Sequence, residues 1–137
     1  MPRIFVVDDE RVIADTLCAI LRGSGYDALA FYDAETTLTA CEDQPPDFVV
    51  TDVSMPGMSG VDMAMQLKQR FSGCGVLLFS GHAATVEVLE VAHRKGYEFE
   101  LLTKPVHPKD LLAKLEGAVR RPVEADVPLL ESDAMAG

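Results

Sequence analysis

Short apolar runs alternate along the chain with longer stretches in which apolar residues recur at helical spacing. Five runs predict strands, at residues 4–7, 28–32, 48–51, 76–80 and within 99–103. The first run shows no alternation of apolar and polar positions, which is typical of a strand covered on both faces. Helical spacing predicts five helices between and after these strands, beginning near residues 10, 34, 61, 83 and 108 and ending near residues 23, 41, 71, 95 and 119.

The regular alternation of strands and helices predicts an α/β fold. Five strand–helix units favour a doubly wound, five-stranded parallel sheet with helices on both faces, which makes a three-layer sandwich. Right-handed crossovers restrict its topology to a few arrangements. In open sheets of this kind, ligands bind beyond the carboxyl ends of the strands. The residues that follow each predicted strand are therefore the first place to look for a site.

Composition and charge exclude several classes of function. The 137 residues suffice for one globular domain, and the net charge of −10 with 12 Lys and Arg argues against a direct nucleic-acid partner. Neither a membrane span nor a secretory signal is evident, so we expect a cytoplasmic protein without a membrane partner. The three cysteines, Cys18, Cys41 and Cys74, are widely spaced and form no CxxC pair, which predicts free, buried or half-buried thiols.

Charged or small polar residues stand at the carboxyl ends of four of the five predicted strands. They are Asp8 and Asp9 after the first, Asp52 after the third, Ser80 after the fourth and Lys104 after the fifth. Three carboxylates close together attract a hard divalent cation such as Mg²⁺. An aspartate can act as a nucleophile toward phosphorus, and a lysine neutralises charge on the phosphoryl oxygens. The set predicts a magnesium-dependent phospho-aspartate site. Glu10, beside the first pair, is interpreted as the acidic first turn of the next helix.

Four stretches in this order and spacing resemble one known family. They are VVDDE at 6–10, VVTDVSMPGMSG at 49–60, LLFSGHA at 77–83 and LLTKPV at 101–106. Together they resemble the receiver domain of two-component response regulators, over residues 3 to about 120. The resemblance implies a flavodoxin-like (CheY-like) fold with strand order 2-1-3-4-5. It assigns residues 1–121 to the receiver domain.

The resemblance also implies how a Mg²⁺ ion would be held. Asp52 matches the aspartate that accepts a phosphoryl group, and its carboxylate also binds the metal. Asp9 matches the direct metal ligand, and Asp8 matches the acid that acts through a metal-bound water. The backbone carbonyl of Ser54, two residues past Asp52, is the remaining protein ligand that the family pattern implies.

Further roles follow from the same resemblance. Lys104 would pair with the phosphoryl oxygens, and Ser80 would supply the hydroxyl that moves toward them on activation. Gly81 would leave room for the phosphoryl donor, and His82 occupies a position that tunes phosphoryl lifetime in the family, although a solvent-facing His82 is an equal alternative. The Lys104–Pro105 bond falls where the family often has a cis peptide.

One position departs from the family pattern. Relatives usually carry Tyr or Phe three residues before the lysine, as a rotameric switch coupled to the hydroxyl, and this chain has Leu101 there. Phe99 shares the same strand face by period-2 alternation and is a candidate substitute. The leucine leaves the phosphoryl chemistry intact and puts the usual coupling in doubt.

The implied function is that of a phosphoacceptor rather than a turnover enzyme. Its partners would be a sensor histidine kinase or histidine phosphotransfer protein and an unknown downstream protein target. The fourth predicted helix carries spare apolar residues, which are either core or a partner face; a homodimer through the fourth helix, fifth strand and fifth helix is one alternative.

Residues 122–137 carry four acids and two prolines and predict a disordered tail. The chain is then a stand-alone receiver or a piece of a longer protein.

Two rival functions remain at this point. A degenerate receiver would act as an unphosphorylated binding module, but it should have lost the acids or the lysine, and only Leu101 favours it. A phospho-aspartyl phosphatase-type hydrolase would also use Mg²⁺ and an aspartate nucleophile. Such hydrolases normally carry a second acid two residues past the nucleophile, where this chain has Ser54.

Overall fold

The computed structural model describes residues 1–81 and 85–120, and the fold follows the predicted alternation of strands and helices. In chain order the elements are β1 (Arg3–Val7), α1 (Arg11–Gly23), β2 (Asp27–Phe31), α2 (Ala34–Asp43), β3 (Phe48–Asp52), α3 (Gly60–Arg70), β4 (Gly75–Ser80), α4 (Thr85–Arg94), β5 (Glu100–Thr103) and α5 (Pro108–Arg120). The predicted tail at 122–137 and His82 lie outside the described residues.

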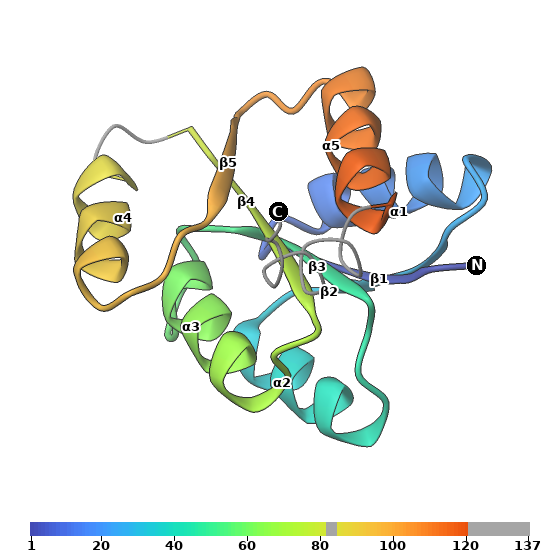
Figure 1. The fold of residues 1–137 in the computed structure, drawn as a ribbon. Helices are drawn as coiled ribbons and strands as arrows, with labels where there is room; N and C mark the ends of the chain where they lie inside the picture. Colours follow the sequence, from blue (N-terminus) through green and yellow to red (C-terminus); the bar gives the residue numbers. More distant parts are fainter. Residues whose placement is uncertain (82–84, 121–137) are drawn as a thin grey trace, which may run out of the picture.

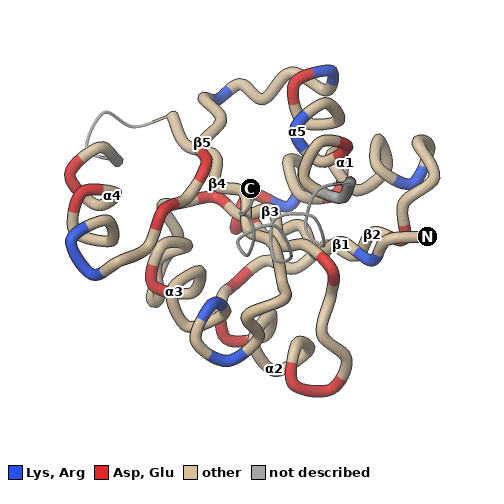
Figure 2. The backbone as a smooth tube through the Cα atoms, in the orientation of Figure 1, with Lys and Arg blue, Asp and Glu red and all other residues tan. Residues whose placement is uncertain are grey.

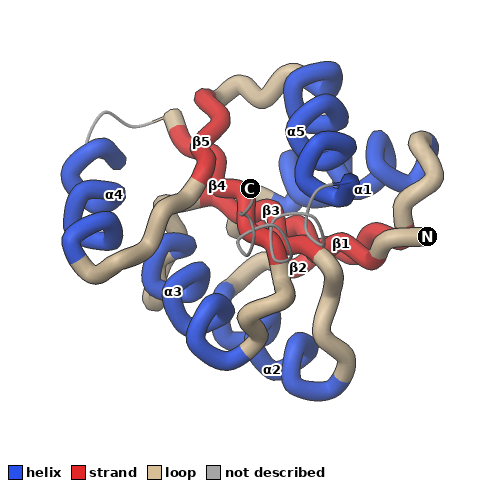
Figure 3. Tube along the Cα trace, in the orientation of Figure 1, coloured by secondary structure: helices blue, strands red, loops and turns tan. Residues whose placement is uncertain are grey.

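The five strands form one parallel sheet in the order β2-β1-β3-β4-β5. Both the doubly wound class and the strand order implied by the family resemblance are therefore confirmed. Figure 1 and Figure 3 show α1 and α5 on one side of the sheet and α2, α3 and α4 on the other. Because all five strands run in the same direction, their carboxyl ends lie along one edge of the sheet.

Two apolar layers hold the helices to the sheet, and neighbouring residues of a strand serve opposite layers. Phe5 and Val7 of β1 pack on the side of α2, α3 and α4, whereas Ile4 and Val6 pack on the side of α1 and α5. All four side chains are fully buried. This double burial explains why the strand reads as an unbroken apolar run instead of an alternating one.

The start of α1 corrects the interpretation of Glu10. Glu10 is the residue before the helix, with extended backbone (φ −83°, ψ 104°), and no acid lies in the first turn of α1. Its N–H donates to Asp8 Oδ1 at 2.9 Å. Because Asp8 accepts this bond, the chain turns at Glu10 and the helix begins one residue later, at Arg11.

The fourth helix is attached to the core by a narrow apolar face. Ala92 is fully buried and Leu89 packs against the same layer. By contrast, Val86 is 60% exposed, Val88 37% and Val91 39%. The spare apolar residues of α4 in the described range thus lie largely at the surface and not in the core.

The cysteines, the basic residues and the length of the helices bear on three further expectations. Cys18, Cys41 and Cys74 are all buried and free, as predicted. Figure 2 shows the Lys and Arg positions dispersed over several helices instead of gathered on one face. Across residues 1–81 and 85–120, no helix has the length and apolar character needed to cross a bilayer.

Candidate functional site

The strand register brings the predicted site residues to one edge of the sheet. Val7 pairs with Thr51, so Asp8 and Asp52 follow on adjacent strands. Ser80 pairs with Thr103, and the N–H of Lys104 donates to Ser80 O at 2.9 Å. The peptide bond between Lys104 and Pro105 is cis, as expected. Groups separated by many residues in the chain thus become neighbours because parallel strands end together.

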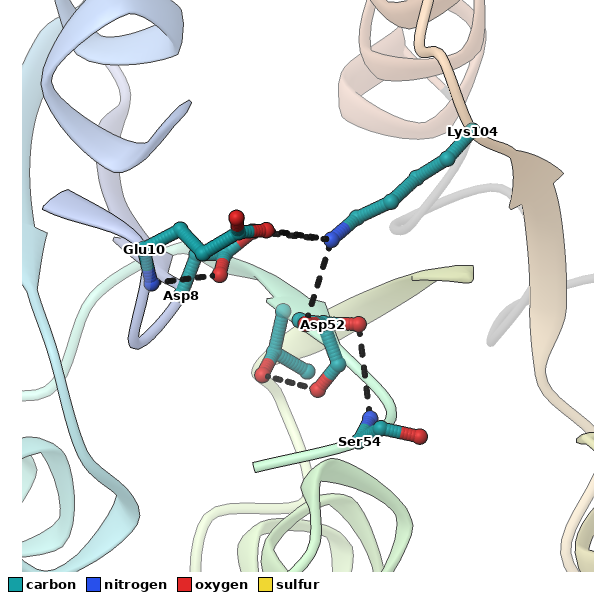
Figure 4. Close-up of polar contacts among 6 residues, drawn as sticks. Asp8, Glu10, Asp52, Ser54 and Lys104 are labelled. Atoms are coloured by element: carbon teal, nitrogen blue, oxygen red, sulfur yellow. Dashed lines mark hydrogen bonds and ion pairs between the residues drawn. The ribbon is translucent and has the colours of Figure 1, made fainter. Parts of the chain in front are cut away.

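Asp52 is the central carboxylate of this edge. The residue is only 4% exposed. Its Oδ2 accepts a hydrogen bond from Lys104 Nζ at 3.2 Å, and its Oδ1 accepts one from the Ser54 N–H at 3.3 Å (Figure 4). The side chain is therefore oriented from two sides, by a cation on the β5 end and by the turn that follows β3.

Asp8 is completely buried beside it. Its Oδ1 accepts the Glu10 N–H, while its Oδ2 lies 3.2 Å from Lys104 Nζ. That Oδ2 atom is buried and has no hydrogen bond of good geometry with any described residue. Burial, aided by the negative charge of Asp52, raises the pKa of the Asp8 carboxyl, while the Glu10 N–H and Lys104 oppose this shift only in part.

Lys104 extends over the edge as the shared cation of the site. Its Nζ contacts Asp52 and Asp8, lies 3.8 Å from Glu10 Oε1, and sits 5.3 Å from the centre of the Phe79 ring. Burial alone would lower the pKa of this ammonium, but the negative charges of Asp52 and Asp8 and the hydrogen bond to Asp52 outweigh it, so the pKa is raised. Lys104 therefore stays protonated. Glu10 is a member of this charge cluster that the sequence interpretation missed.

Asp9 completes a group of three carboxylates. One oxygen from each of Asp8, Asp9 and Asp52 can be chosen such that all lie within 4.8 Å of one another, with Asp9 exposed and the other two buried. Oxygen ligands with an open side suit Mg²⁺, which keeps part of its water shell. Asp8 Oδ2 is buried with an ion pair to Lys104 but no hydrogen bond from any described residue, and three carboxylates carry more charge than one lysine neutralises; both features fit a divalent cation.

The remaining predicted residues lie around this centre. Ser80 is buried at the end of β4, and Gly81 is exposed next to it. A Cβ atom on Gly81 would meet Lys104 Cβ at 3.5 Å, an ordinary contact, so this position lies directly beside the lysine of the site. Leu101 and Phe99 are half-buried and both pack on the layer beneath α4, which confirms that they share a face.

Comparison with known proteins agrees with this geometry. The family model described as "Response regulator receiver domain" matches residues 4–116. The chain belongs to the response regulator receiver family. Receiver domains of two-component response regulators generally bind Mg²⁺ at an acidic pocket, and the Asp8, Asp9 and Asp52 group has that character.

Relatives of known name support the assignment. The DNA-binding response regulator MtrA of Mycobacterium tuberculosis is 34% identical over 119 residues, covering 87% of this chain and 51% of the relative. The transcriptional regulatory protein PhoP of Bacillus subtilis, named for alkaline phosphatase synthesis, is 32% identical over 139 residues, covering 98% and 56%. The chain thus spans about half the length of these curated relatives.

Solved structures show the same receiver architecture. A CheY-like receiver from Methanospirillum hungatei has a TM-score of 0.83 at 25% identity, covering 91% of this chain and 98% of its own. A receiver from Clostridium thermocellum has a TM-score of 0.79 at 28% identity, covering 88% and 96%. The match thus covers nearly the whole of both solved chains.

Proposed function

We propose that this receiver accepts a phosphoryl group on Asp52 from a histidine kinase or histidine phosphotransfer protein. The reaction depends on Mg²⁺, and the phosphorylated domain signals to a partner protein. One observation carries the proposal: the Asp52 carboxylate is held by Lys104 Nζ at 3.2 Å within a group of three carboxylates. This set contains a nucleophile, a cation and a metal-binding group.

The chemistry assigned to the chain's residues is a single displacement at phosphorus. A carboxylate oxygen of Asp52 forms the new O–P bond while the bond from phosphorus to the donor's imidazole nitrogen breaks, and the imidazole leaves with its electron pair. Lys104 neutralises charge on the phosphoryl oxygens in transit. Asp9, Asp52 and the Ser54 carbonyl would hold a Mg²⁺ ion, with Asp8 acting through water, and the bound ion would supply further charge neutralisation.

Other residues tune this reaction in the proposal. Ser80, buried at the end of β4, donates its hydroxyl to the phosphoryl group after transfer. Gly81 leaves the donor's approach open, and His82 affects the lifetime of the product. Leu101 replaces the aromatic switch, so the signal leaves by a route that does not need an aromatic rotamer change there. We assign residues 1–121 to the receiver and 122–137 to a tail.

The rival functions are less well supported by the residues present. The acids and the lysine that a degenerate receiver would have lost are all retained, and Lys104 forms ion pairs with Asp8 and Asp52. A phosphatase-type hydrolase needs a general acid two residues past its nucleophile, and Ser54 offers only a hydroxyl and an N–H that donates to Asp52. We therefore propose a phosphoacceptor that works in the cytoplasm and is not a turnover enzyme.

The downstream partner is proposed to be a protein. Val86, Val88 and Val91 expose apolar surface on α4, which could contribute to such a contact or to a homodimer through α4, β5 and α5. MtrA and PhoP are named as DNA-binding and transcriptional regulators, but only about half of each is matched by this chain. DNA binding is therefore not proposed for the residues present.

The experiment is to incubate the purified protein with Mg²⁺ and acetyl phosphate and to follow the intact mass. The expected result is the gain of one phosphoryl group that requires Mg²⁺ and is removed by hydroxylamine, which cleaves acyl phosphates. Steady release of phosphate from a phosphomonoester would instead favour the hydrolase. Absence of any mass gain would favour the degenerate receiver.

A further inference from the structure

The first residue of α3 touches the backbone of the phosphoacceptor. A Cβ atom built on Gly60 would lie 1.9 Å from the carbonyl oxygen of Asp52 and 2.9 Å from its carbonyl carbon. It would also lie 3.1 Å from Thr51 Oγ1. Non-bonded carbon and oxygen atoms attract only beyond about 3 Å. Any side chain at position 60 therefore requires the end of β3 or the start of α3 to move by about 1 Å.

The same carbonyl is held from within its own strand. The hydroxyl of Thr51, which is fully buried, donates to Asp52 O at 3.0 Å. One residue further on, Val53 O accepts the N–H of Gly60 at 2.9 Å, and the N–H of Val53 donates to Phe79 O at 3.0 Å. The main chain of Asp52 is thus confined on both sides by bonds to its neighbours and by the bare Cα of Gly60.

We infer that Thr51 and Gly60 are positioning residues for the phosphoacceptor. They fix the main chain of Asp52, and thereby hold its carboxylate in one position relative to Asp8, Asp9 and Lys104. This inference deepens the proposed function and rests on it. Both residues act on the backbone carbonyl of Asp52, whereas the hydrogen-bond partners of its carboxylate are Lys104 and Ser54.

Helix propensity and a positioning role predict opposite effects of Gly60→Ala, so this substitution tests the inference. In a helix, Ala is favoured over Gly by up to about 1 kcal/mol. If Gly60 were only the first residue of α3, Gly60→Ala would be neutral or stabilising. If it positions Asp52, the same substitution displaces the carboxylate, and a displacement of about 1 Å can cost a factor of about 100 in rate.

The test compares Gly60→Ala with Gly73→Ala. A Cβ atom on Gly73 would have no atom within 4 Å, and Gly73 has no left-handed φ, so it is a matched control. Two quantities are measured for the folded proteins: the rate of labelling by acetyl phosphate at saturating Mg²⁺ and the Kd for Mg²⁺ followed by NMR.

We expect Gly60→Ala to lower the labelling rate about 100-fold, to weaken Mg²⁺ binding about tenfold, and to shift the Asp52 amide signal. Gly73→Ala should change none of these. A folded Gly60→Ala within about twofold of wild type in both quantities would overturn the inference.

A second pair of variants keeps the inference testable if Gly60→Ala does not fold. Thr51→Val removes the hydroxyl at nearly constant volume, and Thr51→Ser retains it. Loss of one hydrogen bond worth about 1 kcal/mol should slow labelling about fivefold in Thr51→Val, and Thr51→Ser should restore the rate. Equal rates in both variants and wild type would contradict the role of Thr51. If wild type itself is never labelled, the proposed function fails, whereas the Mg²⁺ affinities of the same variants still decide the positioning role.

Discussion

Lys104 Nζ lies 3.2 Å from Asp52 Oδ2, and this contact joins the end of β5 to the end of β3. The same ammonium lies 3.2 Å from Asp8 Oδ2. One cation thus serves two buried carboxylates, with the exposed Asp9 close by. The site carries more negative charge than Lys104 can neutralise, so it attracts a divalent cation.

Replacing Lys104 by Met should separate metal binding from phosphoryl transfer. Without the ammonium, Asp8 and Asp52 repel more strongly, and Mg²⁺ should bind roughly tenfold more tightly, equal to about 1.4 kcal/mol. The labelling rate should fall about 100-fold because the cation that neutralises the phosphoryl oxygens is gone. Lys114→Met is the control, since its contact with Glu100 at 3.5 Å is exposed and contributes little. Weaker Mg²⁺ binding in Lys104→Met would show that the two cations do not compete.

Mg²⁺ should stabilise the fold through the three carboxylates. At about 100 times its Kd, a ligand that binds only the native state adds about 2.7 kcal/mol to the free energy of unfolding. Asp9→Asn should remove this gain and leave the metal-free stability nearly unchanged, since Asp9 is exposed. Urea unfolding with and without Mg²⁺ measures both quantities. An equal gain in Asp9→Asn would place the ion elsewhere.

The N-terminal cap of α2 should make the stability of the fold depend on pH, through a carboxylate outside the phosphorylation site. Asp33 Oδ1 accepts the Thr36 N–H at 2.7 Å, and this bond lowers the pKa of the carboxyl below 3.8. A lowered folded-state pKa means that the carboxylate contributes stability above 3.8 and loses it as the pH falls through the lower value. Asp33→Ala should cost about 1 kcal/mol at neutral pH, and the difference from wild type should shrink below pH 3.8. Asp33→Asn should retain the cap throughout. A difference independent of pH would contradict this assignment.

The cysteines should be inert while the protein is folded. Burial raises the pKa of Cys18 and Cys41 to about 11 and that of Cys74 to about 12. Because the thiolate is the reactive form, a thiol reagent at a pH of about 8 should modify none of the three in the native protein and all three in urea. Modification of a native thiol at the rate of a small free thiol would show that the local packing opens.

Much of the fold follows from local pattern, because unbroken apolar strands alternate with helical stretches. The same rule predicts that Asp8, Asp52 and Lys104 meet, since parallel strands end at one edge. The hydrophobic pattern does not predict where a helix begins when a side chain outside the helix binds the backbone at its start. Helical spacing of the neighbouring residues places Glu10 inside the helix, whereas the bond from its N–H to Asp8 holds it outside.

Two other features depend on contacts between distant segments. The approach of Gly60 to the Asp52 carbonyl arises from how the start of α3 packs on β3, and one glycine in a loop sequence carries no signal for it. The valines of α4 have spacing compatible with a core face, yet Val86 and Val91 are exposed because only the narrow side around Ala92 meets the sheet.

The central claim is that Asp52 carries the phosphoryl group, and trapping tests it most directly. The protein is incubated with Mg²⁺ and acetyl phosphate, reduced with borohydride to convert aspartyl phosphate to a stable alcohol, and mapped by peptide mass spectrometry. We predict reduction at Asp52 alone, dependent on Mg²⁺ and absent in Asp52→Ala. Reduction at another residue, persistence of phosphoryl incorporation in Asp52→Ala, or no incorporation into wild type would contradict it.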